Sequence, residues 1–345
     1  MRDGLRLAPL FPLNNTVAVY RDGCMSAFSF KQDEKLDLAA RAAWLYYVAG
    51  NTQQAIARKL KISRPAAQRL VAMALAKGIV KVRVHHRIAG CLELADQLCR
   101  RFNLSLCEIV PSNGDGTDPL LRKLAVTGSQ VMETYFSATE PKVIALSTGR
   151  TLKAVVEELS EIPRPQHRLV SLVGAFAKDG SSNRYDVTLR AAEKTGSKYF
   201  LLPAPMFADS PEERKQWCHH RLYRVVENLS AQADVAFVGV GEIGPGCPIQ
   251  RDGFVTKQEV VELQQSGAVG EILGWAFDLY GEMVKASTHA RVTSVPLRSP
   301  PSRPVIAFAA GLRKVRAVLG AVRGGWVNGL VTDESCARRL LEARD

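Results

Sequence analysis

The stretch YYVAGNTQQAIARKLKISRPAAQRLVAMALAKGIVKVRV, residues 46–84, decides the fold of the first part of this chain. Apolar residues recur at helical spacing in it and just before it, which predicts helices over residues 36–49, 53–60 and 64–77. Only residues 61–63 separate the last two helices. Two helices joined by so short a turn form a helix-turn-helix, whose second helix can enter the major groove of DNA. The sequence therefore predicts a DNA-binding module.

Local signals mark where these helices begin and end. Asn51 or Thr52 can cap the second helix and Ser63 the third, because their side-chain oxygens can accept hydrogen bonds from the free amides of the first turn. Gly78 ends the third helix. Lys61 stands at a turn position that usually takes glycine, because the backbone there has a positive φ. A lysine can adopt that conformation at a cost of about 1 kcal/mol.

The charge of this module points to a polyanion. No acidic residue lies between Asp37 and Glu93, and this window holds ten Lys or Arg residues. Residues 1–88 contain 15 Lys or Arg and 5 Asp or Glu, so they supply most of the net charge of +12. So basic a stretch repels itself unless a polyanion neutralises it. The N-terminal part therefore has an electrostatic reason to bind nucleic acid, and the remainder does not.

The helix-turn-helix geometry assigns roles to the polar residues. Arg can bind guanine and Gln can bind adenine in a bidentate manner, whereas basic residues at the backbone bind phosphates and position the protein. The residues expected at the groove are Ser63, Arg64, Ala66, Gln68 and Arg69. The residues expected to bind phosphates are Arg58, Lys59, Lys81 and Arg83. Residues 79–86 alternate apolar and basic side chains, which predicts a wing strand. The alternative is a helical hairpin with a solvated basic face.

Beyond residue 104 the pattern changes to that of an α/β domain. Apolar and β-branched runs alternate with helical patterns, at residues 106–110, 142–147, 168–174, 198–202, 234–240, 304–310 and 326–332. This alternation predicts a mainly parallel sheet, which binds its ligands beyond the carboxyl ends of the strands. The expected organisation is a flexible extension over 1–32, a winged helix-turn-helix over 33–88, a linker helix over 89–104 and a larger ligand-binding α/β domain over 105–345.

Two of the predicted strands end in segments suited to a polar ligand. Ser147, Thr148, Gly149, Arg150 and Thr151 lie between a strand and a helix, where hydroxyls and free helix amides suit a phosphate or a polyol. Simple helix capping is the alternative. Gly241 lies in the segment GVGEIG, residues 239–244, but the prolines at 245 and 248 exclude the helix of a dinucleotide-binding fold. We expect a loop at the rim of the site there.

Two further segments carry candidate ligand-binding side chains. Glu271 and Asp278 follow a glycine-rich stretch and could accept hydrogen bonds from hydroxyl groups, although the glycines could serve chain geometry alone. Lys314 follows another strand and could reach an anionic group, and a solvated lysine is the alternative.

Residues 46–84 resemble the N-terminal domain of the SorC family of bacterial sugar-responsive transcription regulators, and the resemblance extends over roughly residues 38–342. The family has similar segments at 149–151, 239–244, 267–271 and 311–314, with Asp in the place of Glu271. The resemblance implies a regulator whose operator binding responds to a sugar, polyol or sugar phosphate. It also implies a ligand-binding domain similar to sugar-phosphate isomerases and deaminases, and a homodimer or homotetramer that reads a palindrome. An isomerase-like enzyme with an appended DNA-binding domain, using Glu271 or Asp278 for proton transfer, is the alternative.

The sequence gives little support for a metal site, a disulfide framework or a membrane span. The seven cysteines form no CxxC pair, which argues against a zinc site and a disulfide framework and favours a reducing cytoplasm. The adjacent pairs His85-His86 and His219-His220 cannot ligate one metal together on a strand or a helix. No apolar run approaches the roughly 20 residues of a membrane span. We expect no cofactor, no metal and no membrane partner.

Overall fold

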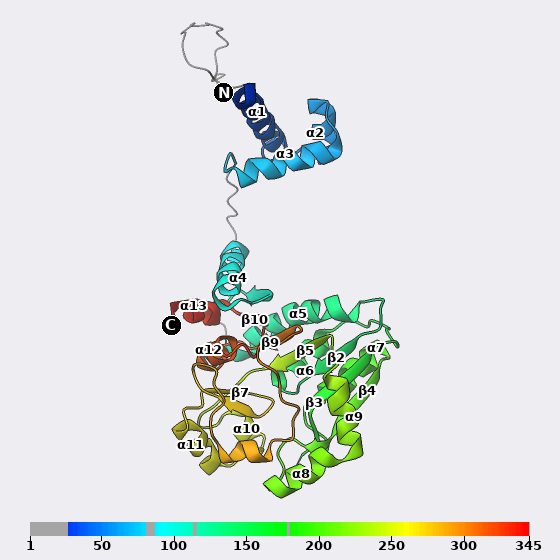
Figure 1. Cartoon of the computed structure of the whole chain (residues 1–345), viewed down its shortest axis with the longest axis vertical. Coiled ribbons are helices and arrows are strands. Elements are labelled where there is room, and N and C mark those ends of the chain that lie inside the picture. The colour runs from blue at the N-terminus through cyan, green and yellow to red at the C-terminus, as the bar shows by residue number, and fades with distance from the viewer. Residues whose placement is uncertain (1–26, 81–86, 113–115, 178–179, 345) are drawn as a thin grey trace, which may run out of the picture. The chain divides into compact units, whose positions relative to one another are not determined.

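The computed structural model describes residues 27–80, 87–112, 116–177 and 180–344 (Figure 1). The chain divides into two compact units, Met1–Val84 and His85–Asp345. No helix among the described residues is both long and apolar enough to cross a bilayer.

The described part of the first unit contains three helices, α1 (Ala27–Tyr47), α2 (Gln53–Leu60) and α3 (Arg64–Ala76). The sequence predicts all three, but α1 begins nine residues earlier than predicted and includes residues 27–32, which were expected to belong to a flexible extension. The caps predicted from the sequence are present. Thr52 accepts a hydrogen bond from the amide of Ala55 at 3.2 Å, and Ser63 accepts one from the amide of Ala66 at 3.3 Å. Lys61 adopts the left-handed conformation, with φ 53° and ψ 43°. The expected wing, with Lys81 and Arg83, lies outside the described residues.

Small side chains fill the core of this unit. The buried residues are Ala39, Ala42, Ala43, Ile56, Ala57, Ala67, Leu70, Val71 and Ala74. Six of these nine are alanines, so the three helix backbones approach one another closely. Helix α3 packs against both α1 and α2. Within the described part of this unit, its polar side chains lie outside the core.

The second unit is organised around a seven-stranded sheet with the strand order β1-β10-β9-β5-β2-β3-β4. Every pair of neighbours is parallel. Its strands are β1 (Leu106–Val110), β2 (Val143–Leu146), β3 (Arg168–Phe176), β4 (Lys198–Pro205), β5 (Val235–Gly239), β9 (Val305–Phe308) and β10 (Gly329–Asp333). Each corresponds to a run predicted from the sequence, and the predicted α/β fold is confirmed.

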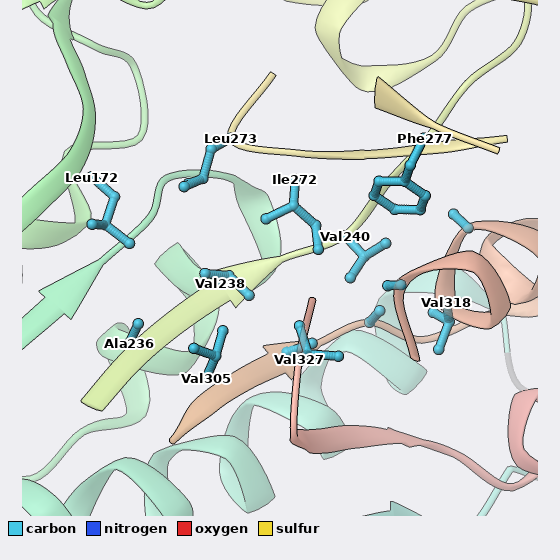
Figure 2. Packing of buried hydrophobic residues seen from close by; sticks show 14 of the residues in the cluster. Leu172, Ala236, Val238, Val240, Ile272, Leu273, Phe277, Val305, Val318 and Val327 are labelled. Carbon is cyan, nitrogen blue, oxygen red and sulfur yellow. The ribbon is translucent and has the colours of Figure 1, made fainter. Parts of the chain in front are cut away.

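Side chains alternate between the two faces of the sheet along each strand, so both faces carry apolar side chains. Helices cover both of these faces. In β2, Ile144 and Leu146 pack into one core cluster, while Val143 and Ala145 pack into the other. The first face is covered by α5 (Thr117–Phe136), α6 (Arg150–Glu158) and α7 (Val187–Thr195). The helices on the other face include α4 (Arg87–Phe102), α9 (Arg221–Ser230), α12 (Val315–Arg323) and α13 (Glu334–Glu342), and α11 (Lys257–Gln265) contributes side chains to the same core cluster. Part of that second cluster, with Val238, Val305 and Val318, is shown in Figure 2.

Helix α4 covers most of the expected linker, residues 89–104, and belongs to the second unit. Its residues Cys91, Leu94 and Leu98 are buried in the large core cluster. It packs against β1 and α13. The residues expected to form a separate linker are therefore a structural part of the α/β unit.

A small antiparallel sheet lies beyond the end of β5. It consists of β6 (Gly241–Glu242), β7 (Gly270–Ile272) and β8 (Trp275–Phe277), and Gly241 pairs with Glu271. The unit also contains the short helices α8 (Pro211–His219) and α10 (Pro248–Arg251) and the 3-10 helices η1 (Ser287–Arg291) and η2 (Leu312–Lys314). The buried side chains Val240, Ile272 and Phe277 join this sheet to the main core (Figure 2).

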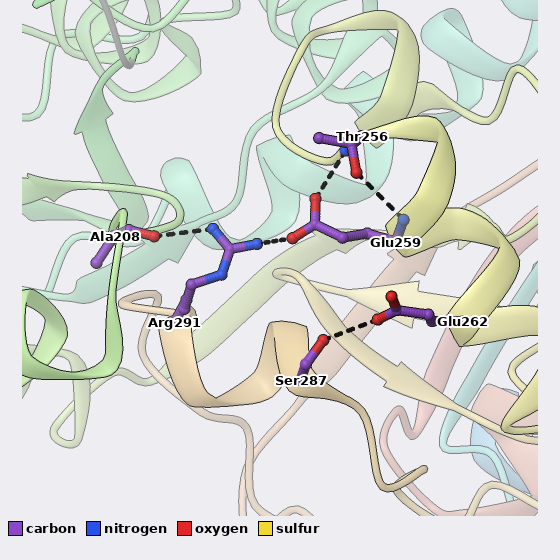
Figure 3. A network of polar contacts seen from close by, with 6 residues as sticks. All are labelled: Ala208, Thr256, Glu259, Glu262, Ser287 and Arg291. Carbon is purple, nitrogen blue, oxygen red and sulfur yellow. Dashed lines mark hydrogen bonds and ion pairs between the residues drawn. The ribbon is translucent and has the colours of Figure 1, made fainter.

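A polar network fixes helix α11, which precedes β7. Thr256 and Glu259 form a capping box at the start of the helix. Arg291 donates hydrogen bonds to the carboxylate of Glu259 and to the carbonyl of Ala208, the latter at 2.9 Å (Figure 3). The Arg291 and Glu259 side chains are only 13% and 18% exposed, so this pair is largely protected from water. The network thus ties together segments far apart in the sequence.

Candidate ligand cavity

A cavity of about 770 Å³ lies at the carboxyl ends of the central strands. Its walls come from the carboxyl ends of all seven strands and include Ser112 after β1, Ser147 after β2, Tyr185 after β3, Met206 after β4, Val240 after β5, Ala310 after β9 and Asp333 at the end of β10. Strands β2 and β5 are neighbours, and the strand order reverses between them. Ligands of open α/β sheets bind at such a reversal. The volume suits a small sugar or polyol.

The fold brings together eight of the nine candidate ligand-binding residues. Those that line the cavity are Ser147, Thr148, Gly149, Arg150, Thr151, Gly241, Glu271 and Lys314. Asp278 is not among the lining residues, and the structure corrects this candidate. Its Oδ1 accepts hydrogen bonds from the amides of Tyr280 and Glu282, each at 2.9 Å, so the carboxylate stabilises a turn.

The N-terminus of α6 opens into the cavity. Gly149 precedes it with φ 128°, a conformation that favours glycine, and makes no side-chain cap. The first amides of the helix are therefore free for hydroxyl or phosphate oxygens. Thr148 is held beside them, because its hydroxyl donates to the carbonyl of Tyr185 at 2.9 Å. Arg150 is exposed at the start of the helix.

Lys314 also lines the cavity, and hydrogen-bond acceptors surround its ammonium group. Its Nζ donates to the carbonyl of Val240 at 2.6 Å and lies 3.9 Å from Glu242 Oε2. Glu271 is 8% exposed, and its Oε2 accepts a hydrogen bond from the amide of Gly274 at 2.7 Å. The buried ammonium therefore faces two carboxylates.

Burial dominates the electrostatics of this wall. It raises the pKa of Glu271, and the Gly274 hydrogen bond and the charge of Lys314 act in the opposite direction. Burial lowers the pKa of Lys314, while Glu242 and Glu271 favour its charged form. Each charged form is thus stabilised mainly by its neighbours on the same wall.

Four carboxylates in the lining, those of Asp118, Glu242, Asp252 and Asp333, were not among the residues predicted from the sequence. Glu242 lies inside the GVGEIG segment, in which only Gly241 was predicted to bind the ligand. Asp252 accepts a hydrogen bond from the Tyr185 hydroxyl at 3.1 Å. Asp333 accepts from the amide of Gly311 at 2.6 Å and also caps α13. The last could have been found, because it ends a predicted strand, where the ligand-binding edge of the sheet lies.

The candidate DNA-binding residues of the first unit lie on one module. Arg58 and Lys59 are exposed on α2, and Arg64, Gln68 and Arg69 are exposed on α3. Ser63 caps α3, and Ala66, whose amide it binds, is half-buried. The exposed start of α3 therefore presents basic and amide side chains together.

Comparisons with known proteins identify the family. Residues 86–342 match the family model "Putative sugar-binding domain". The chain is 33% identical over 304 residues to the erythritol catabolism regulatory protein EryD of Brucella abortus, covering 88% of this chain and 96% of that protein. The chain belongs to the SorC family of sugar-responsive transcriptional regulators. The transcriptional regulator LsrR of Escherichia coli K12 is 30% identical over 333 residues, covering 93% of this chain and 99% of that regulator.

This SorC-family regulator also resembles family members in its fold. The full-length sorbitol operon regulator SorC from Klebsiella pneumoniae superposes with a TM-score of 0.67 at 25% identity, covering 89% of this chain and 98% of that one. Regulators of this family bind DNA and sugar effectors. The SorC-family protein is a transcriptional regulator and not an enzyme, so the alternative of an isomerase-like catalyst is set aside.

Proposed function

We propose that the cavity at the strand ends is the effector site of this regulator, and that its occupant is a sugar, a polyol or a sugar phosphate. The observation that carries the proposal is the convergence of eight candidate residues, chosen from separate strand ends, on one cavity of about 770 Å³. The wall at α6 offers amides and hydroxyls, and the wall at Lys314 offers an ammonium beside carboxylates. A hydroxyl group both donates and accepts hydrogen bonds, so it can pair with the donors and with the acceptors of these walls.

In the proposed arrangement the first unit binds operator DNA through α3. Arg64, Gln68 and Arg69 contact base edges near Ser63 and Ala66. The phosphate contacts come from Arg58, Lys59, Lys81 and Arg83. The exposure of α2 and α3 side chains supports this assignment, as does the absence of acidic residues between Asp37 and Glu93. The functional boundaries would be 33–88 for the DNA-binding module and 105–345 for the effector domain, with the protein acting in the cytoplasm.

A homodimer or homotetramer is part of the proposal, because a symmetric pair of modules is needed to read a palindrome. The effector would bind two conformations with different affinity and thereby change the population that can engage DNA. EryD is a regulator of erythritol catabolism and SorC is a sorbitol operon regulator. Erythritol and sorbitol are therefore the first compounds to test, with their phosphate esters.

A gel-shift experiment tests the proposal directly. Full-length protein is mixed with the DNA upstream of its own gene, at several salt concentrations, with and without each compound. We expect binding that weakens steeply with salt and an effector that changes it. Arg150→Ala should weaken that response, whereas Lys153→Ala, one turn along α6 and outside the cavity, should preserve it. An effector response that is the same in both variants would count against the cavity.

A further inference from the structure

The carboxylate of Glu242 stands between the two cations of one cavity wall. Its Oε2 lies 3.9 Å from Lys314 Nζ, and its Oε1 lies 3.7 Å from an Arg313 guanidinium nitrogen. The Glu242 side chain is only 14% exposed, whereas that of Arg313 is 70% exposed. The carboxylate therefore occupies the protected position beside the lysine, and Arg313 approaches it from the solvent side.

The backbone holds Glu242 in this place. It lies on β6, where it pairs with Gly270 of β7, while Gly241 pairs with Glu271. Lys314 is fixed from the other side by its hydrogen bond to Val240, the residue that precedes β6. The ammonium and the two carboxylates thus come from segments that are joined by a sheet ladder and a short hydrogen bond. Their proximity is a property of the fold.

The Glu242 carboxylate offsets one of the positive charges of this wall. Lys314 and Arg313 bring two positive charges, and Glu242 and Glu271 bring two carboxyl groups. A phosphate at this wall would have to displace or repel Glu242 before it could use Lys314, since like charges in a partly dry site strongly disfavour one another. A phosphate oxygen is also an acceptor and cannot donate to the carboxylates. A hydroxyl group can accept from Lys314 and donate to Glu242 at once.

We infer that Glu242 is a specificity-determining residue that neutralises Lys314, so that the effector presents hydroxyl groups and not phosphate to this wall. The inference rests on the proposed function, because it takes the cavity as the effector site. It predicts the orientation of the effector, because the part of the effector that lies near β6 must be uncharged. Any phosphate that the effector carries lies away from Lys314.

The test removes the charge of Glu242 and measures the binding of inorganic phosphate and of sorbitol 6-phosphate by calorimetry on the full-length protein. Glu242→Gln should raise the affinity for both by about tenfold, as expected for the loss of one adjacent like charge. The gain should vanish in the double variant E242Q/K314Q, because it depends on the freed ammonium. Glu242→Asp keeps the charge and should bind phosphate as weakly as the wild type. Glu282→Gln makes the same charge change at an exposed position outside the cavity and should leave affinity unchanged.

Two results separate the failure of this inference from that of the proposed function. If wild-type protein already binds the phosphate probes through Lys314, and Glu242→Gln brings no gain, the inference is overturned while the cavity remains the effector site. If an effector still changes operator binding fully in the double variant R150A/K314Q, which alters both walls, the cavity is not the site and the proposed function fails. Thermal unfolding of each variant verifies that the fold is intact.

Discussion

Glu271 occupies the space where residue 241 would carry a side chain. The two residues face each other across the β6–β7 ladder, and a Cβ at position 241 would collide with Glu271 Oε1. A side chain at position 241 therefore fits only if the Glu271 carboxylate moves from its present position.

We expect Gly241→Ala to push the Glu271 carboxylate out of place, destabilise the fold by about 1–3 kcal/mol, as overpacking does, and weaken effector binding. The matched control is Gly244→Ala in the same segment but outside the cavity lining, where a Cβ would meet only the side-chain nitrogen of Gln264 at 4.0 Å. Thermal unfolding and effector titration measure both effects. Equal behaviour of the two variants would show that the contact with Glu271 is unimportant.

The buried carboxyl of Glu271 should make stability depend on pH. Burial holds its pKa above the usual value, so the folded protein retains a proton that the unfolded chain has lost. Stability should therefore fall as pH rises from the ordinary Glu pKa of about 4.3 through the raised value, with a slope of up to about 1.4 kcal/mol per pH unit within that interval.

Glu271→Gln abolishes this titration, so the stability of the wild type relative to the variant should decline over the same pH range. Urea unfolding of both proteins at a series of pH values measures the difference. Glu282→Gln, at an exposed position, supplies the comparison. If the profiles of the two variants are parallel, the carboxyl of Glu271 is not the source of the effect.

Substitutions on α3 should separate base contacts from phosphate contacts. Arg64→Ala and Arg69→Ala should each lower operator affinity by about 1–3 kcal/mol and relax sequence preference. Lys59→Ala should weaken binding to all sequences and reduce the salt slope by about one. Fluorescence anisotropy with operator and random DNA distinguishes these outcomes. Arg221→Ala, exposed on α9 of the other unit, controls for the loss of one charge. Undiminished operator binding by Arg64→Ala would exclude α3 as the reading helix.

Lys61 offers a route to a more stable first unit. Its φ of 53° is costly for a side chain and natural for glycine. Lys61→Gly should therefore raise the free energy of unfolding of this unit, by up to about 1 kcal/mol. The control is Lys77→Gly, because Lys77 caps α3 with φ −88° and gains nothing from glycine. Circular dichroism during heating measures both, and a loss of stability in Lys61→Gly would contradict the argument.

Local chemistry explains why so much of the fold could be predicted. The caps Thr52 and Ser63 satisfy helix amides that lie within three residues of them. The central strands of the parallel sheet are buried on both faces, so they appear as continuous apolar runs such as VIAL at 143–146. These signals are contained in the segment itself and need no information on tertiary structure.

The composition of the cavity depends on contacts that sequence patterns do not carry. Glu271 reaches the wall only because β7 pairs with β6, some 30 residues earlier in the chain. Asp278 lies just beyond the same small sheet and has the same functional group, yet it binds backbone amides of a turn. Glu242 is adjacent to predicted Gly241, but its significance arises from Lys314, which follows a distant strand. Long-range pairing, and not residue type, decides which carboxylate faces the ligand.

The alanine-rich core of the first unit limits which substitutions its buried positions can accept. Six of its nine buried positions already hold the smallest side chain that a regular helix favours. Nearly every substitution at those positions adds volume between helices that are already in contact, and only glycine subtracts any. Substitutions in this core are therefore limited by overpacking, whereas substitutions in a leucine-rich core are limited by the cavities that they create. Lineages that vary the DNA sequence they recognise would change the exposed face of α3 and leave its inner face fixed.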